Sequence, residues 1–370
     1  MPLIDDDGSL FGLVNVVDAL VALFVVALVI GGSAFVLADD SEPVPTTDEP
    51  ETETRYATLD LGDQPKYVAE LLSEGDATVS ESGNLTVTDV YAVPTQTSDR
   101  RVFVRVELTG EPSDETIQYD GDIPRVGRQL TIETDDYRTD GTITTVDETD
   151  SNLPTENESM LLRATVPTET AEAIEPGDEY DVDGRTVGTV ESVTAYGTDD
   201  PDRKRVYVGV TYRALRLNGD LHVGDTRLHE NVALSFETDA YDFNGTVARV
   251  GTTEQSGEPA TRTVQLEIEN VDPDLADSLD TDMAERVRGE TVAELTRVDV
   301  EPSTVVLTSE DGQIYQRDHP VEKDVSMTAQ LSVRETPAGL TFKGERLQQG
   351  DEVVLDLGTV TVRATVVRIE

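Results

Sequence analysis

The chain has 370 residues, and 76 Asp and Glu against 28 Lys and Arg give it a formal net charge of −48 at pH 7. Such a charge repels itself in dilute buffer and is screened in concentrated salt, so we interpret the composition as that of a halophilic protein. The alternative is an acidic surface that binds cations or a basic partner. The low number of basic residues argues against nucleic-acid binding, and the lack of cysteine excludes disulfides, thiolate catalysis and Cys-ligated metals.

A long apolar run follows a short acidic head at residues 1–8. From Ala19 to Ala38 the chain carries no charge over roughly 20 residues, enough for a helix of about 30 Å that spans a bilayer. A signal peptide has a shorter apolar region behind a positive charge, and residues 1–18 hold no Lys or Arg. The sequence therefore predicts an uncleaved transmembrane anchor at residues 9–38, although Gly31 to Ala34 resembles a cleavage site.

Two polar residues mark the beginning of this run. Asn15 and Asp18 are three residues apart, and we interpret them as capping or interfacial groups at a helix N-terminus rather than as a functional pair. Ala27 and Gly31 form a small-xxx-small pair that allows helix pairing and a homo-oligomer.

The segment at residues 39–55 is rich in Pro, Thr and acidic residues and has no apolar periodicity, which predicts a disordered stalk. Three N-x-S/T sequons follow, at Asn84, Asn157 and Asn244. The first basic residue is Arg55, so the positive-inside rule does not set the orientation. The stalk and the sequons favour an extracytoplasmic soluble portion in the cell envelope.

The soluble portion contains an internal repeat of about 104 residues. The stretch RVFV at residues 101–104 matches RVYV at 205–208, and Gly75-Asp76 matches Gly177-Asp178. A more divergent third copy ends the chain, with residues 365–369 matching 246–250 at a larger offset. The larger offset places an insertion before Val325, within residues 300–324.

The units are predicted at residues 56–150, 160–253 and 261–370, each mainly β with one short helix. β-branched residues and Gly/Asp turns favour small barrels or sandwiches, either as separate domains or as one body that exchanges strands. Valines at 102, 104 and 106 alternate and predict a strand with one buried face. The predicted helices and the glycines expected at their C′ positions are 65–74 with Gly75, 169–175 with Gly177, and 273–287 with Gly289.

The inventory for catalysis is small, and we predict no catalytic, cofactor-binding or metal-binding residues. His222, His229 and His319 have no metal-site spacing, and no phosphate-binding glycine loop or serine elbow occurs. Asp181-Val182-Asp183-Gly184 and Asp5-Asp6-Asp7-Gly8 resemble fragments of a calcium loop, but D-x-D-G is also an ordinary hairpin turn.

The N-terminal stretch resembles domain-of-unknown-function family 4330. The family pattern is an acidic head, then L-F-G and N-x-x-D leading into the apolar span, here Leu10-Phe11-Gly12, Asn15 and Asp18. The haloarchaeal branch of the family fits the acidic composition. The resemblance implies a topology and a source, because the family carries no established activity.

A second stretch, residues 174–196, is similar to the core hairpin of MCE domains, which are lipid-binding barrels behind one transmembrane helix. Gly177, Gly184, Val187, Gly188 and Val190 fit that pattern, whereas the corresponding stretches of the other two copies do not fit it well.

Three functional hypotheses follow from these patterns. The first is a non-enzymatic, membrane-tethered module that binds a protein, lipid or envelope polymer, or serves as a scaffold. The second is an MCE-like lipid carrier that assembles into a ring. The third is a hydrolase that uses paired carboxylates, which would need two acids with a perturbed pKa in one concave site.

Overall fold

The computed structural model describes residues 9–10, 14–15, 52–80, 83–95, 99–113, 116–308 and 314–370. In the unit formed by Met1–Glu51, the described residues are two short paired strands, β1 (Ser9–Leu10) and β2 (Val14–Asn15). Asn15 is the last residue of β2, and the capping or interfacial role expected for its side chain stays a prediction. No helix among the described residues is long and apolar enough to cross a membrane. The run from Ala19 to Ala38, Asp18 and most of the stalk lie outside the described residues.

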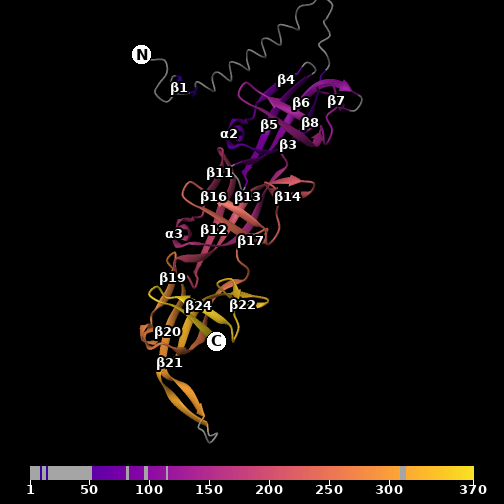
Figure 1. Cartoon of the computed structure of the whole chain (residues 1–370). Helices are drawn as coiled ribbons and strands as arrows, with labels where there is room; N and C mark the ends of the chain where they lie inside the picture. Colours follow the sequence, from indigo (N-terminus) through magenta and orange to yellow (C-terminus); the bar gives the residue numbers. More distant parts are fainter. Residues whose placement is uncertain are drawn as a thin grey trace, which may run out of the picture. The chain divides into compact units, whose positions relative to one another are not determined.

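The unit formed by Thr52–Glu370 is mainly β and contains three antiparallel sheets of the same design (Figure 1). Repeat 1 contains β3 (Glu53–Gln64), α2 (Lys66–Leu71), β4 (Ala77–Ser80), β5 (Gly83–Pro94), β6 (Arg100–Ser113), β7 (Thr116–Gln118), β8 (Gln129–Glu133) and β9 (Arg138–Asp147). Repeat 2 contains β10 (Thr155–Pro167), α3 (Thr168–Ala173), β11 (Glu179–Val182), β12 (Arg185–Gly197), β13 (Arg203–Leu217), β14 (Asp220–Val223), β15 (Thr226–Arg227), β16 (Ala233–Glu237) and β17 (Asp242–Val250). Repeat 3 contains β18 (Glu258–Val271), α4 (Pro273–Ser278), β19 (Ala284–Val287), β20 (Glu290–Thr308), β21 (Ile314–Thr336), β22 (Gly339–Phe342), β23 (Glu345–Arg346), β24 (Glu352–Asp356) and β25 (Thr361–Ile369).

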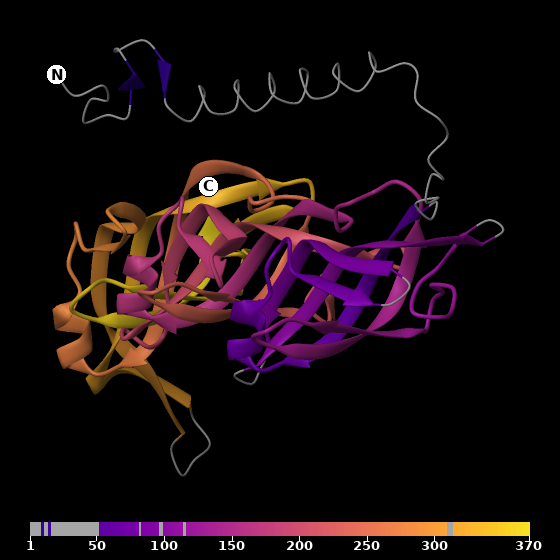
Figure 2. The ribbon, with the colours of Figure 1, turned by 90° about the horizontal axis from the view of Figure 1, so that it is seen from above.

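The strand order is the same in all three sheets. It is β4-β5-β6-β3-β9-β8 in repeat 1, β11-β12-β13-β10-β17-β16 in repeat 2 and β19-β20-β21-β18-β25-β24 in repeat 3. Each sheet takes all its described strands from one repeat, so the strand exchange considered from the sequence is not seen in this part of the chain. In both views the strands of a sheet curve around a common interior, which makes each repeat barrel-like (Figures 1 and 2).

Each repeat is itself built from two similar halves. After β3, Gly75 takes a φ of 94° and donates its N–H to the carbonyl of Val87 in β5, at 2.8 Å. After β6, Gly127 takes a φ of 88° and donates in the same way to Ile143 in β9, at 2.8 Å. Such positive φ values favour glycine. In repeat 3 the position of Gly75 is filled by Asp282, which has a φ of 69° and donates to Leu295.

That substitution explains the one helix that the sequence places wrongly. We expected a helix over residues 273–287, whereas α4 ends at Ser278 and residues 284–287 form β19. Because Asp282 makes the turn that glycine makes in the other repeats, no glycine marks the end of α4, and Gly289 lies in the β19–β20 hairpin turn instead. The other helices end at Leu71 and Ala173, so Gly75 and Gly177 lie in the following turn rather than at C′.

The first and last strands of a sheet approach each other through side chains. In repeat 1, Thr78 in β4 donates to the carbonyl of Glu133 in β8 at 3.1 Å and accepts its N–H at 2.8 Å. In repeat 2 the Tyr241 hydroxyl donates to Asp178 at 2.5 Å, and Tyr137 pairs with Asp76 in repeat 1 in the same way. Repeat 3 carries Met283 and Val360 at these positions, so a polar contact is replaced there by two apolar side chains.

The central strand β6 is buried on both faces rather than on one. Val102, Val104 and Val106 have exposures of 0% and pack in the core of repeat 1. Phe103, from the opposite face, belongs to the core that continues into repeat 2. Arg105 is 1% exposed and bonds to Asp147 at 2.7 Å. The second face is buried because the next repeat and the linker cover it, which strand alternation cannot show.

Repeat 3 carries an additional hairpin arm. β20 and β21 are longer than their counterparts, and Thr304 to Thr308 pair with Asp318 to Ile314 beyond the sheet. The arm projects from the sheet in both views (Figures 1 and 2). It is the insertion that the sequence predicts within residues 300–324, and the first two repeats have no such extension among their described residues.

Buried tyrosines should make the fold sensitive to alkali. Burial raises the pKa of Tyr91, Tyr180 and Tyr212 above their ordinary value of 10.0. Above about pH 10 the unfolded chain releases its tyrosine protons, whereas the folded state keeps the protons of the buried tyrosines. Their contribution to the free energy of unfolding is therefore complete below about pH 10 and falls at higher pH. We expect the urea midpoint in concentrated KCl to decrease from pH 9 to pH 12. Tyr212→Phe should reduce this decrease and Tyr67→Phe, on the surface, should not; a constant wild-type midpoint would contradict the interpretation.

Candidate functional site

The most distinctive chemistry lies at the two junctions between repeats, which share the position of an arginine but differ by one residue in the position of its acidic partner. At the first junction Asp225, which follows β14, pairs with Arg101 at the start of β6, with 2.9 Å between Oδ1 and Nε. At the second junction Glu345 at the start of β23 pairs with Arg205 at the start of β13, at 3.1 Å. Arg101 and Arg205 occupy the same position in successive repeats. One hairpin of each later repeat thus docks on the central strand of the repeat before it.

An aromatic side chain supports each hairpin tip. Phe103 lies in the first junction and Tyr207 in the second, again at equivalent positions. Gly344, at the tip between β22 and β23, has a φ of 79°, and a Cβ added there would overlap the Tyr207 hydroxyl. A Cβ on Gly224, at the first tip, would lie 2.8 Å from Val93. Both tips need glycine because the neighbouring repeat approaches their backbone closely.

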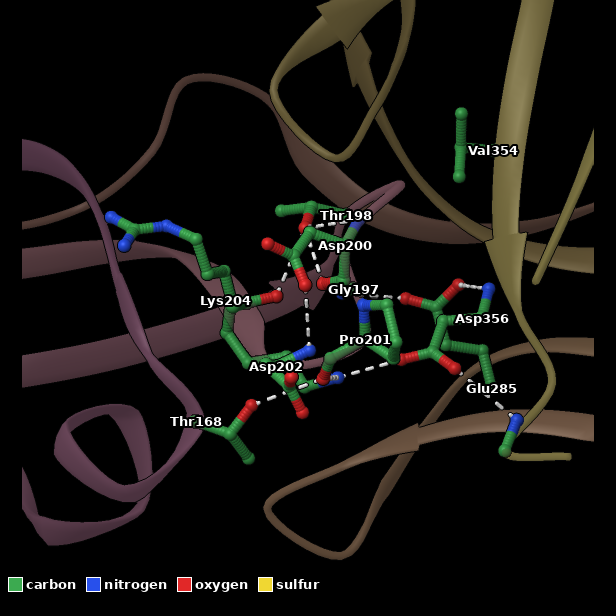
Figure 3. Close-up of polar contacts among 12 residues, drawn as sticks. Thr168, Gly197, Thr198, Asp200, Pro201, Asp202, Lys204, Glu285, Val354 and Asp356 are labelled. Atoms are coloured by element: carbon green, nitrogen blue, oxygen red, sulfur yellow. Dashed lines mark hydrogen bonds and ion pairs between the residues drawn. The ribbon is translucent and has the colours of Figure 1, made fainter. Parts of the chain in front are cut away.

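A buried charged network joins repeats 2 and 3 (Figure 3). Glu285 in β19 has an exposure of 0%, and Lys343, which follows β22, has an exposure of 8%. The Lys343 Nζ lies 2.5 Å from Glu285 Oε2 and donates to the carbonyls of Val354 at 2.7 Å and Gly197 at 3.2 Å. Glu285 accepts the N–H of Gly197, the last residue of β12, at 2.8 Å. Both polar groups of the Gly197 backbone are therefore bonded by repeat 3.

A second ion pair extends this network. Lys204 in β13 lies 2.6 Å from Asp356 in β24, and the Asp356 N–H donates to Glu285 at 3.1 Å. Figure 3 shows Lys204, Asp356 and Glu285 around the chain from Gly197 to Asp202. We define the charged junction as Lys204, Glu285, Lys343 and Asp356 together with the Gly197 backbone. It contains two cationic and two anionic side chains, so it is balanced within a chain that is strongly acidic overall.

Burial and the neighbouring acids act in opposite directions on the pKa of Lys343, the lysine at the centre of this network. Burial lowers the pKa of Lys343 below its ordinary value of 10.5, while Glu285 and Asp356 act in the opposite direction. The Glu285 carboxylate accepts hydrogen bonds from three donors, which are the Lys343 ammonium and the backbone N–H groups of Gly197 and Asp356. Loss of one partner would leave a buried charge without compensation, and such a loss is strongly destabilising.

The first junction uses different chemistry at the equivalent of Glu285. That position is Tyr180 in β11, which is buried and packs against Phe236 with ring centroids 5.5 Å apart. Ion pairs lie around it, between Arg100 and Asp183 at 3.6 Å and between Arg213 and Asp89 at 3.3 Å. The first junction is therefore more aromatic, and the second depends more on buried charge.

Arginines from each later repeat also cap the short helix of the repeat before it. Arg185 donates to the carbonyl of Leu72, at the end of α2, at 3.1 Å. Arg288 donates to Ala171 in α3 at 2.7 Å. Carbonyls at a helix C-terminus have no partner within the helix, and a cation is favourable there.

A cavity of about 260 Å³ opens beside the charged junction. Its floor includes Lys343 and Phe342, and its rim carries Arg205, Arg346 and Arg363. Arg363 lies 3.6 Å from both Asp199 and Glu352, so its pairing is loose. The lining also contains Asp199, Glu345 and Glu352, so three acidic side chains accompany the three arginines.

Within the part of the chain that the structure describes, the residues singled out in the sequence do not form a metal site. His222, His229 and His319 each contact nearby backbone, with His222 Nδ1 3.2 Å from the carbonyl of Asp220. Asp183 lies in a hairpin turn beside Arg100, and residues 5–8 lie outside the described part of the chain. Across the described residues no group of three His, Asp or Glu is placed to hold a metal ion.

The junction residues carry no pattern in the sequence that marks them as interacting. Lys204 and Lys343 are two of only four lysines in the chain, in which arginine supplies most of the positive charge. The rarity of lysine could have marked these two residues as candidates. Their partners Asp356 and Glu285 could not be found among 76 acidic residues without the fold.

These features define a protein of three successive β repeats, joined head to tail by charged hairpin junctions behind an N-terminal segment. The family model for a domain of unknown function, DUF4330, matches residues 1–102 and 241–370. The chain belongs to this family. The unmatched residues 103–240 are somewhat more than one repeat, and they include most of repeat 2. Searches of curated proteins and of solved structures found no match to the chain.

Proposed function

We propose that the chain is a non-enzymatic envelope protein that holds three β repeats at a membrane surface as one body, for binding or scaffolding. The apolar run from Ala19 to Ala38 supplies the tether. The observation that carries the proposal is the pair of junctions between repeats, because their charged side chains are used to hold repeats together. The net charge of −48 supports a high-salt environment, as in the haloarchaeal branch of the family.

Surface features support an extracytoplasmic location for the repeats. The sequon residues Asn84, Asn157 and Asn244 are all exposed, so each is accessible to modification. Partners of this surface would be a protein, a lipid or an envelope polymer, with the cavity beside the charged junction as the first place to test.

The two alternatives have weaker support. An MCE-like carrier predicts a ring of copies with an apolar channel, which its mass in detergent and co-purified lipid would reveal. The hairpin on which that resemblance rests occurs in all three repeats, including those whose sequences do not fit the MCE pattern. A carboxylate hydrolase stays a prediction that no contact in the described residues favours.

Protease treatment of intact cells tests the proposed location. We expect the repeats to be degraded in intact cells held in high salt, while the N-terminal segment stays in the membrane fraction. A cytoplasmic marker must remain intact as a control. Degradation only after lysis would contradict the extracytoplasmic location, and recovery of intact protein in the soluble fraction would contradict the tether.

A further inference from the structure

The free end of repeat 1 carries an apolar surface that the other repeats lack. In repeats 2 and 3 this end holds the hairpin that docks on the preceding repeat, and repeat 1 has no preceding repeat. Its equivalent turn is Asp120-Gly121, closed by a bridge between Tyr119 and Asp122. β3 also begins at this end, because Glu53 pairs with Gly110 just before the β6–β7 turn. The chain from residues 1–51 therefore enters the fold here.

Three exposed aliphatic side chains distinguish this end. Val79, Ile123 and Val126 have exposures of 79%, 36% and 67%. The backbone pairings identify their counterparts in the other repeats, and these are exposed and charged or polar. They are Asp181, Arg227 and Glu230 in repeat 2 and Arg286, Arg346 and Gln349 in repeat 3. The fold does not require apolar residues at these positions, so another contact of repeat 1 must account for them.

We propose that this end of repeat 1, formed by Val79 and the loop Ile123–Val126, docks on the lipid surface in which the anchor lies. The inference rests on the proposed membrane tether. The apolar run ends at Ala38 and β3 begins at Glu53, so the connecting chain reaches at most about 50 Å and keeps this end close to the bilayer. Arg125 lies between the two apolar residues of the loop with 62% of its side chain exposed. It pairs with the exposed Asp122 at 3.4 Å, and a surface pair of this kind is weak enough to exchange for the lipid phosphates.

The absence of native cysteine makes a direct test possible. The full chain would be reconstituted in vesicles of phosphatidylcholine with a minor share of phosphatidylglycerol, in concentrated KCl. An environment-sensitive fluorophore is attached to Val126→Cys or, as the control, to Val321→Cys on the exposed arm of repeat 3. Lipids with a nitroxide headgroup should quench the label at position 126 several-fold more than the label at 321.

A second variant tests the apolar side chains themselves. Val79→Asp with Ile123→Arg copies repeat 2, whose fold accepts both residues, and should reduce quenching at position 126 to the control level. Equal quenching at 126 and 321, or no effect of the variant, would overturn the docking surface. A change in the label that also occurs in detergent without vesicles would indicate contact between copies and would likewise overturn it. Failure of the protein to float with vesicles would instead overturn the tether on which the inference rests.

Discussion

Replacing Lys343 with methionine should destabilise the protein by about 3–5 kcal/mol, because the Glu285 carboxylate then stays buried without its cation. Glu285 is fully buried and accepts the Gly197 N–H of repeat 2 as well as the Lys343 ammonium. The effect should therefore appear at the boundary of repeats 2 and 3 rather than within repeat 3 alone. Urea unfolding in concentrated KCl, followed by circular dichroism, measures it.

The double variant Lys343→Met with Glu285→Gln shows whether the two side chains stabilise the protein as a coupled pair or independently of each other. Since it removes both charges, it should be more stable than Lys343→Met alone, with a coupling energy of about 1–3 kcal/mol. Arg205→Gln is the matched control, because its partner Glu345 has a side-chain exposure of 62% and a pair of that kind contributes about 0–1 kcal/mol. Additive effects of the two core changes would contradict the network.

Gly344→Ala should destabilise the protein through a clash at the same junction. The added Cβ would overlap the Tyr207 ring and hydroxyl in repeat 2, and Gly344 has a φ of 79°. Strain from a positive φ alone costs about 1–2 kcal/mol per residue. The clash adds to this, so we expect a total loss of more than about 3 kcal/mol, near the upper range of single substitutions.

Gly350→Ala is the control for Gly344→Ala, since Gly350 has a φ of 89° and open space around an added Cβ. Its loss should be limited to backbone strain. If the two alanine variants are equally stable, the β22–β23 hairpin does not pack tightly on repeat 2. If Gly344→Ala is the less stable of the two, as expected, hydrogen exchange should show faster opening of β13 and β22 together.

The repeated architecture could be predicted from the sequence because its signals are local. The glycines before each hairpin, the alternating strands and the offset of about 104 residues identified three similar β units. The insertion before Val325 was also found, and it forms the arm of repeat 3. The exception is Asp282, which takes the left-handed turn of Gly75 and so concealed the end of α4. Asp tolerates this conformation better than most residues, but composition does not reveal it.

The junctions could not be predicted, because their contacts join residues far apart in the chain. Lys343 and the Gly197 carbonyl are separated by 146 positions, and Lys204 and Asp356 by 152. With 76 acids available, pattern alone does not select the partners of a lysine. Phe103 shows the same limit, since its burial depends on repeat 2. The apolar end of repeat 1 became visible only when Val79, Ile123 and Val126 could be compared with their structural counterparts.

The central claim is that the charged junction couples repeat 2 to repeat 3. Native-state hydrogen exchange of the full chain in detergent and concentrated KCl tests it most directly, with β13 and β21 as reporters. We predict that both strands of the wild type open with the same free energy and the same denaturant dependence, and that Lys343→Met separates them. Different opening free energies for the two strands in the wild type would contradict the account.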